Sequence, residues 1–161
     1  IKKNFSEHPI HVYTENGNVF VIYSLLFHKP LPLNVLNTTS ALSILLLTGA
    51  FFYFHRKHKP LLIQTLIFAL TLYMLVELFI PVHRHQYNTV QWFPIVLAGF
   101  LFITDWKHPS FILCILGLIL NISNASWIPM RHSLGEICWL AALLLIAFTP
   151  AENKITWKQP S

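Results

Sequence analysis

Long apolar runs, each ended by proline or by basic and histidine residues, constrain this sequence more than any other feature. Runs that fit a membrane helix cover residues 34–54, 61–80, 89–104, 110–120 and 132–148. A helix needs about 20 apolar residues to cross a bilayer, so the third and fourth runs are short and must tilt little or lie partly embedded. Charged residues make up only 11% of the chain, against roughly 25% in soluble domains. We therefore predict an all-α fold, a polytopic membrane helix bundle with about five membrane-embedded helices.

The segments outside these runs divide the chain into three parts. Residues 1–33 are polar and rich in turn-forming residues, apart from the apolar stretch 19–27, which is too short to cross a bilayer. We expect 1–33 to form an outer-face loop with a short interfacial helix near 19–27. Residues 34–149 form the transmembrane bundle, with Asn34 or Asn37 as the expected N-cap of its first helix. Residues 150–161 form a cytoplasmic tail.

The first residue is Ile1 rather than Met, and the residues after it are polar rather than signal-like. We therefore expect a chain whose N-terminal part is missing or has been cleaved off.

Basic residues predict the orientation of the bundle. The turns after the first and third runs and the C-terminal tail carry Arg56, Lys57, Lys59, Lys107, Lys154 and Lys158. The turns on the other side carry only Arg84 and Arg131, although Lys2, Lys3 and Lys29 also fall on that side. Cytoplasmic turns are enriched in Lys and Arg, so the first group is predicted to face the cytoplasm. The segment 1–33 and the turns near residues 83–87 and 121–132 then face outward.

The turn at residues 83–87 is the strongest candidate for a binding site. His83, Arg84, His85, Gln86 and Tyr87 follow one another directly between two apolar runs. Such a set of donors suits an anionic or sugar-like ligand at the membrane surface. The alternative is that Arg84 reaches to lipid headgroups and the histidines cap a helix end.

Further polar residues lie near the same predicted face. Glu77 and Glu136 are in apolar surroundings, where ionisable groups are costly and face a partner or a wet cavity. We expect Glu77 to face the bundle interior. Glu136 follows His132 by four residues, so these two can pair on one helix face. Arg131 and His132 join the candidate binding residues.

Metal and haem sites are disfavoured by where the nine histidines fall. All of them lie at helix ends or in loops, whereas a bis-histidine haem needs histidines inside facing helices. Cys114 and Cys138 lie in apolar runs without metal-ligand spacing. We therefore predict no cofactor and no metal site among these residues, and leave a bound divalent metal open. The scattered basic residues also argue against nucleic acid as a partner. Tryptophans at the ends of the runs, Trp92 among them, are expected to be interfacial anchors.

The arrangement of spans and the turn at 81–94 carry a resemblance. The chain resembles the C-terminal half of polytopic glycosyltransferases that use polyprenyl-phosphate sugars, and most nearly glycosyltransferase family 87, the mannosyltransferase- and arabinofuranosyltransferase-like group. The matching residues are Pro81, Arg84, His85 and Tyr87, followed by Trp92 and Pro94.

The resemblance implies sugar transfer from a polyprenyl-phosphate donor on the outer face of a bacterial inner membrane. Arg84 would then hold the donor phosphate with two hydrogen bonds and His85 would add another, while Gln86 and Tyr87 meet sugar hydroxyls. In this family a catalytic Asp or Glu lies in the first outer loop, and Glu7 and Glu15 are the only weak candidates for that base here.

Two other classes of function stay open. The chain fits a non-enzymatic membrane subunit or scaffold associated with other membrane subunits. It also fits a small transporter module in which Glu77, Arg84 and Glu136 form buried pairs or a permeation path.

Overall fold

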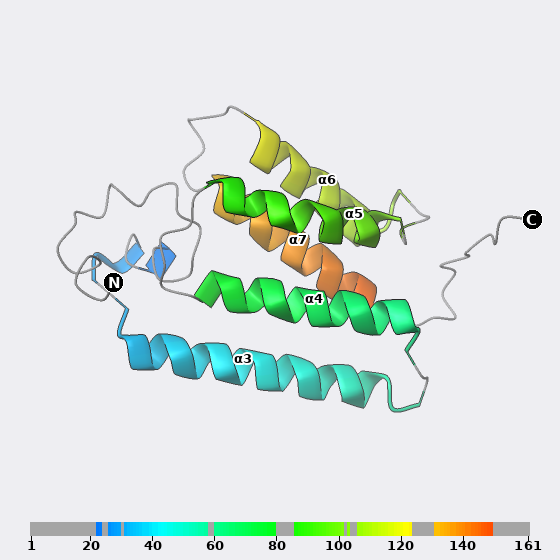
Figure 1. Cartoon of the computed structure of the whole chain (residues 1–161), viewed down its shortest axis with the longest axis horizontal. Coiled ribbons are helices and arrows are strands. Elements are labelled where there is room, and N and C mark those ends of the chain that lie inside the picture. The colour runs from blue at the N-terminus through cyan, green and yellow to red at the C-terminus, as the bar shows by residue number, and fades with distance from the viewer. Residues whose placement is uncertain are drawn as a thin grey trace, which may run out of the picture.

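The computed structural model describes residues 22–23, 26–29, 31–57, 60–79, 86–101, 103, 106–123 and 131–149, with the backbone alone for 86–88. Every regular element among these residues is a helix (Figure 1). The α-helices are α3 (Leu33–Phe54), α4 (Leu62–Phe79), α5 (Phe93–Phe100), α6 (Pro109–Ile122) and α7 (Arg131–Phe148), and the 3₁₀ helix η2 covers Gln86–Trp92. The predicted all-α fold is confirmed for the described part of the chain.

Three of these helices, α3, α4 and α7, are long and apolar enough to cross a membrane, judged by length and composition. The apolar helices Thr89–Phe100 and Pro109–Ile122 are shorter. With 14 residues, α6 is about 21 Å long at 1.5 Å per residue, less than the roughly 30 Å of a hydrocarbon core. The short third and fourth runs of the sequence therefore form short helices.

The start of α3 differs from the prediction, because neither Asn34 nor Asn37 is its N-cap. The helix begins at Leu33 after Pro32, which makes no side-chain capping bond. The Pro32 carbonyl accepts from the Leu36 amide at 3.0 Å. The φ angle of Pro32, −59°, is fixed by its ring and already suits entry into a helix. Both asparagines consequently lie within the first turns of α3.

The third run is also not one continuous α-helix over 89–104. It begins as η2 and becomes α-helical only at Phe93, with Pro94 in the first turn of α5. A proline has no N–H to donate, and its ring would clash with the carbonyl four residues earlier in a continuing α-helix. This explains why the residues before Pro94 take a tighter winding. The helix ends at Phe100, and Thr104 lies outside the described residues.

The interfacial helix expected near 19–27 is described only in part. Ile22, Tyr23, Leu26 and Phe27 are helical, and the rest of that segment lies outside the described residues. His28 follows with a φ of 52°, the left-handed conformation that often ends a helix.

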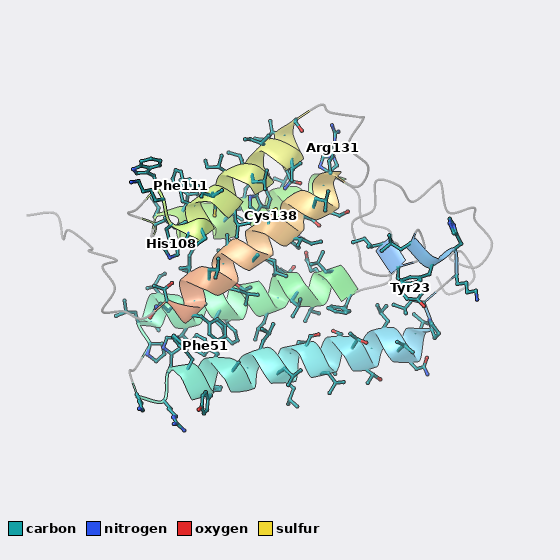
Figure 2. The ribbon with its side chains drawn as sticks, turned by 180° about the vertical axis from the view of Figure 1, so that it is seen from behind. Tyr23, Phe51, His108, Phe111, Arg131 and Cys138 are labelled. Atoms are coloured by element: carbon teal, nitrogen blue, oxygen red, sulfur yellow. The ribbon has the colours of Figure 1, made fainter. Side chains whose placement is uncertain are left out.

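Consecutive helices run in opposite directions, so the bundle has two distinct ends (Figure 1). We call one the η2 end: it holds the start of α3, the end of α4, η2, the end of α6 and the start of α7. The opposite end holds the turn after α3, the start of α4, the α5–α6 connection and the end of α7. Figure 2 shows Arg131 at the η2 end and His108 at the opposite end.

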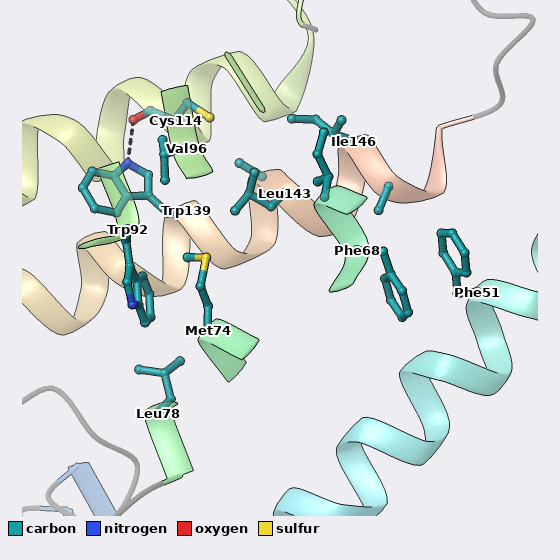
Figure 3. Packing of buried hydrophobic residues seen from close by; sticks show 13 residues of the cluster. Phe51, Phe68, Met74, Leu78, Trp92, Val96, Cys114, Trp139, Leu143 and Ile146 are labelled. Carbon is teal, nitrogen blue, oxygen red and sulfur yellow. Dashed lines mark hydrogen bonds between the residues drawn. The ribbon is translucent and has the colours of Figure 1, made fainter. Parts of the chain in front are cut away.

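The core runs along α7 between these ends (Figure 3). Near the opposite end, the rings of Phe51 and Phe68 stack at 4.1 Å. Towards the η2 end, Met74, Trp92 and Trp139 are fully buried. The Trp139 indole N–H donates to the Cys114 carbonyl at 3.1 Å, which joins α7 to α6 in the core.

Two glycines allow α6 and α7 to approach closely. A Cβ atom on Gly117 would lie 2.8 Å from the Gly135 carbonyl oxygen, and one on Gly135 would lie 3.0 Å from the Gly117 carbonyl oxygen. Real Cβ atoms essentially never lie under 3.0 Å from such an atom, and a Cβ atom on Gly135 would also clash with Asn121 Nδ2, so a side chain at either position would force its neighbours to shift. Small residues at helix interfaces are typical of membrane bundles.

Two side chains, one directly after α3 and one from α4, donate hydrogen bonds to the C-terminal end of α7. His55 Nε2–H donates to the Ala147 carbonyl at 2.9 Å, and Gln64 Nε2 donates to the Thr149 carbonyl at 2.6 Å. The last carbonyls of a helix have no partner within the helix. These two bonds therefore satisfy the end of α7 and fix it to the neighbouring helices.

Candidate functional site

The candidate site is the η2 end of the bundle, where polar side chains from four elements lie close to one another. Of the predicted binding residues, Gln86 and Tyr87 are the first residues of η2, and Arg131 and His132 begin α7. His83, Arg84 and His85, together with Glu7 and Glu15, lie outside the described residues. The ligand-binding roles predicted for the side chains of residues 83–87 therefore stay predictions.

Glu77, near the end of α4, accepts hydrogen bonds from several side chains. The Tyr73 hydroxyl donates to Glu77 Oε1 at 2.5 Å from one turn earlier. Gln91 Nε2 donates to both carboxylate oxygens, at 2.7 and 2.9 Å, and the Trp92 indole N–H donates to Oε2 at 2.7 Å. Glu77 is half-buried, whereas Trp92 is fully buried. The carboxylate thus ties the end of α4 to the end of η2.

Glu136 provides a second attachment for η2. It lies on α7, it is 3% exposed, and Oε1 accepts from the Thr89 hydroxyl at 2.8 Å. Hydrogen bonds to charged groups contribute more than those between neutral groups, about 1.5–3 kcal/mol each. Both carboxylates among the described residues therefore bind η2, one from α4 and the other from α7.

The pairing that we expected between Glu136 and His132 stays a prediction, and the contacts that the structure gives for His132 are with Arg131 and Asn121. Arg131 Nε donates to His132 Nε2 at 3.3 Å, and His132 Nδ1 lies 3.4 Å from Asn121 Oδ1. Accepting at Nε2 requires that the His132 proton sit on Nδ1, which can then donate to Asn121. Asn121 Nδ2 in turn donates to the Gly117 carbonyl at 2.9 Å.

Arg131 is held in place by the residues around it. Its Nη1 donates to the Ser123 carbonyl at 2.5 Å, just after the end of α6. With Nε and Nη1 engaged, Nη2 has no hydrogen-bond partner among the described residues and can donate to an anion. A cation at the start of a helix is disfavoured by the helix dipole, so the dipole gives no structural reason for Arg131 to be there.

Several residues at this end did not emerge from the sequence. Thr89, Gln91 and Asn121 make the polar contacts, and Trp92 is a core residue rather than the interfacial anchor that we expected. The spacing of four residues between Tyr73 and Glu77 was a usable signal, because it places both on one helix face. The contacts of Glu77 with η2 carried no such signal, since only the packed bundle brings these segments together.

Comparisons with protein-family models, with curated proteins and with solved structures found no match to this chain.

Proposed function

We propose that this chain is the membrane-embedded part of a glycosyltransferase that takes its sugar from a polyprenyl-phosphate donor, with the donor site at the η2 end. In this proposal all five helices are embedded in a bacterial inner membrane and the segment near 19–27 lies at its outer surface. The opposite end, with Arg56, Lys57 and Lys107, then faces the cytoplasm.

The observation that supports the proposal best is the firm attachment of η2. Glu77 and Glu136 bind this helix through Gln91, Trp92 and Thr89. The helix begins with Gln86 and Tyr87 and directly follows the turn that holds Arg84. A site that stabilises a transition state benefits from side chains on a rigid support, because displacing a substrate-positioning group by about 1 Å can lower the reaction rate strongly.

Arg131 supplies a second reason to expect an anion here. Its guanidinium is fixed by bonds to Ser123 and His132, so little side-chain entropy remains to be lost on binding. In the proposal Arg84 holds the donor phosphate, with His83, His85, Arg131 and His132 as further donors, and Gln86 and Tyr87 contact the sugar. Stabilising the departing phosphate is an electrostatic contribution to glycosyl transfer.

Glu77 and Glu136 are poor candidates for the catalytic base. Glu77 accepts hydrogen bonds on both oxygens, and Glu136 is buried against Thr89. A base must reach the acceptor hydroxyl with an available lone pair. The proposal therefore assigns these two carboxylates to holding η2 and keeps Glu7 and Glu15 as the weak candidates for the base.

The test is the conservative variant Arg84→Lys in the longest available form of the protein, measured as binding of, or transfer from, a polyprenyl-phosphate sugar. A phosphate clamp loses its planar two-pronged donor on this change, so we expect binding to fall by about tenfold or more, with a smaller loss for His85→Ala. Lys107→Gln, which changes an exposed cation at the opposite end, is the control and should bind like wild type. Equal binding by wild type and Arg84→Lys refutes the clamp.

A second function deserves a test because the polar groups at the η2 end also bind one another. The bonds of Glu77, Glu136, Arg131 and Asn121 described above are all within the protein. Such a set also suits a non-enzymatic membrane subunit or a small transporter module, where it would only hold the bundle together. Absence of donor binding by wild type, together with stable association with another membrane protein, would favour the subunit.

A further inference from the structure

The C-terminal half of α3 carries a second feature, which lies at the opposite end of the bundle from the candidate donor site. Arg56 and Lys57 follow the end of α3 and are exposed, and the Arg56 guanidinium lies 4.5 Å from the centre of the Tyr53 ring. Glu77 and Glu136, the acids of the described part of the chain, are engaged at the η2 end. These two cations therefore have no carboxylate partner among the described residues, and their charge is left for an anion.

An exposed apolar strip runs along α3 towards these cations. Leu42, Leu46 and Tyr53 share one face of α3 at helical spacing, and Leu46 and Tyr53 are 69% and 67% exposed. Only Leu36 and Phe51 of α3 are buried. Figure 1 shows α3 at the margin of the bundle, next to α4.

Gly49 lies on the same strip, four residues before Tyr53. A Cβ atom built there meets nothing within 4 Å. A glycine inside a helix costs about 1 kcal/mol relative to alanine, and the packing of the described residues gives no reason for it. The space where a side chain of residue 49 would lie is therefore open.

We propose that Arg56, Lys57 and this strip of α3 bind one anionic phospholipid. The phosphate lies against the two cations, and an acyl chain runs along α3 over Gly49. Charge complementarity selects an anionic headgroup, and each Lys or Arg near an anionic membrane surface contributes about as much as a fivefold change in binding. The Tyr53 ring holds Arg56 at the level where the headgroup meets the chain. This inference rests on membrane embedding but not on sugar transfer.

The experiment measures the thermal unfolding midpoint of the whole chain in neutral detergent, titrated with phosphatidylglycerol or with phosphatidylcholine of the same acyl chains. A ligand that binds only the folded protein raises the midpoint according to its affinity. We expect phosphatidylglycerol to raise the midpoint of wild type at concentrations where phosphatidylcholine has no effect. Soluble glycerol phosphate should not replace the lipid, because it lacks the acyl chain.

Two pairs of variants locate the site. Arg56→Gln/Lys57→Gln should need roughly 10- to 30-fold more phosphatidylglycerol for the same rise, whereas Lys29→Gln, exposed near the other end of α3, should behave like wild type. Gly49→Leu should weaken the effect by filling the open space at Gly49, and Ala41→Leu, exposed on a different side of α3, should not. The proposal is overturned if the two lipids act equally, if glycerol phosphate acts like the lipid, or if the variants match their controls.

Discussion

Replacing Glu77 by alanine is the sharpest test of how η2 is held. The change removes the acceptor of three side chains, those of Tyr73, Gln91 and Trp92. Tyr73 and Gln91 are exposed, and at the membrane surface, where the proposal places the η2 end, water and lipid headgroups offer them other acceptors. We therefore expect the loss of these two bonds to cost little. Trp92 is fully buried, and a buried donor without a partner costs about 1–3 kcal/mol. We therefore expect Glu77→Ala to lower the free energy of unfolding by about 2–3 kcal/mol.

The assay is reversible unfolding in mixed micelles, followed by circular dichroism, for a double-mutant cycle with Trp92→Phe. If the indole–carboxylate bond carries most of the loss, Glu77→Ala costs much less in the Trp92→Phe background, with a coupling energy of about 1 kcal/mol or more. Glu77→Gln keeps an acceptor and the shape of the side chain, so it should cost less than alanine. Effects that add to within about 0.3–0.5 kcal/mol would refute the assigned role of this bond.

Three further predictions concern other parts of the bundle. Thr89→Val removes the hydroxyl that donates to buried Glu136 and should lower the free energy of unfolding by about 1–3 kcal/mol; Thr89→Ser should restore most of it, and equal values for valine and serine would contradict the role of the hydroxyl. Gly117→Ala should lower the free energy of unfolding by more than about 2 kcal/mol, because its Cβ atom would clash with Trp139 and the Gly135 carbonyl. Gly49→Ala should raise it by up to about 1 kcal/mol. The same unfolding assay compares the two variants. The cysteine of a Lys57→Cys variant should react with a membrane-impermeant thiol reagent only after the membrane is permeabilised. Labelling from outside intact cells would reverse the predicted orientation.

The helices could be predicted from the sequence because their signals are local. Apolar runs bounded by prolines or by basic and histidine residues gave the bounds of α3, α4 and α7 to within one residue. The N-cap prediction was wrong because Pro32, which precedes both asparagines, already takes the non-helical backbone angles of an N-cap residue. The α5 segment failed because a proline inside an apolar run changes the winding before it, and hydropathy does not register that change.

The candidate site was less accessible from the sequence. An acid within an apolar run signals a polar partner, and Glu77 and Glu136 do have such partners. The identity of the partners depends on how the helices pack. Glu77 of α4 contacts residues of η2, and Asn121 of α6 contacts His132 of α7. Spacing along one helix predicts the contact between Tyr73 and Glu77 but not the contact between Glu77 and Trp92.

The central claim, a donor site at the η2 end, is tested most directly by photo-crosslinking with a polyprenyl-phosphate sugar that carries a photoreactive group beside its phosphate. After digestion and mass spectrometry, the account predicts that labelled peptides come from residues 81–92 and 123–132, and that unlabelled donor suppresses the labelling. Labelling confined to the turns at 55–60 and 104–108, or labelling that unlabelled donor does not suppress, would contradict it.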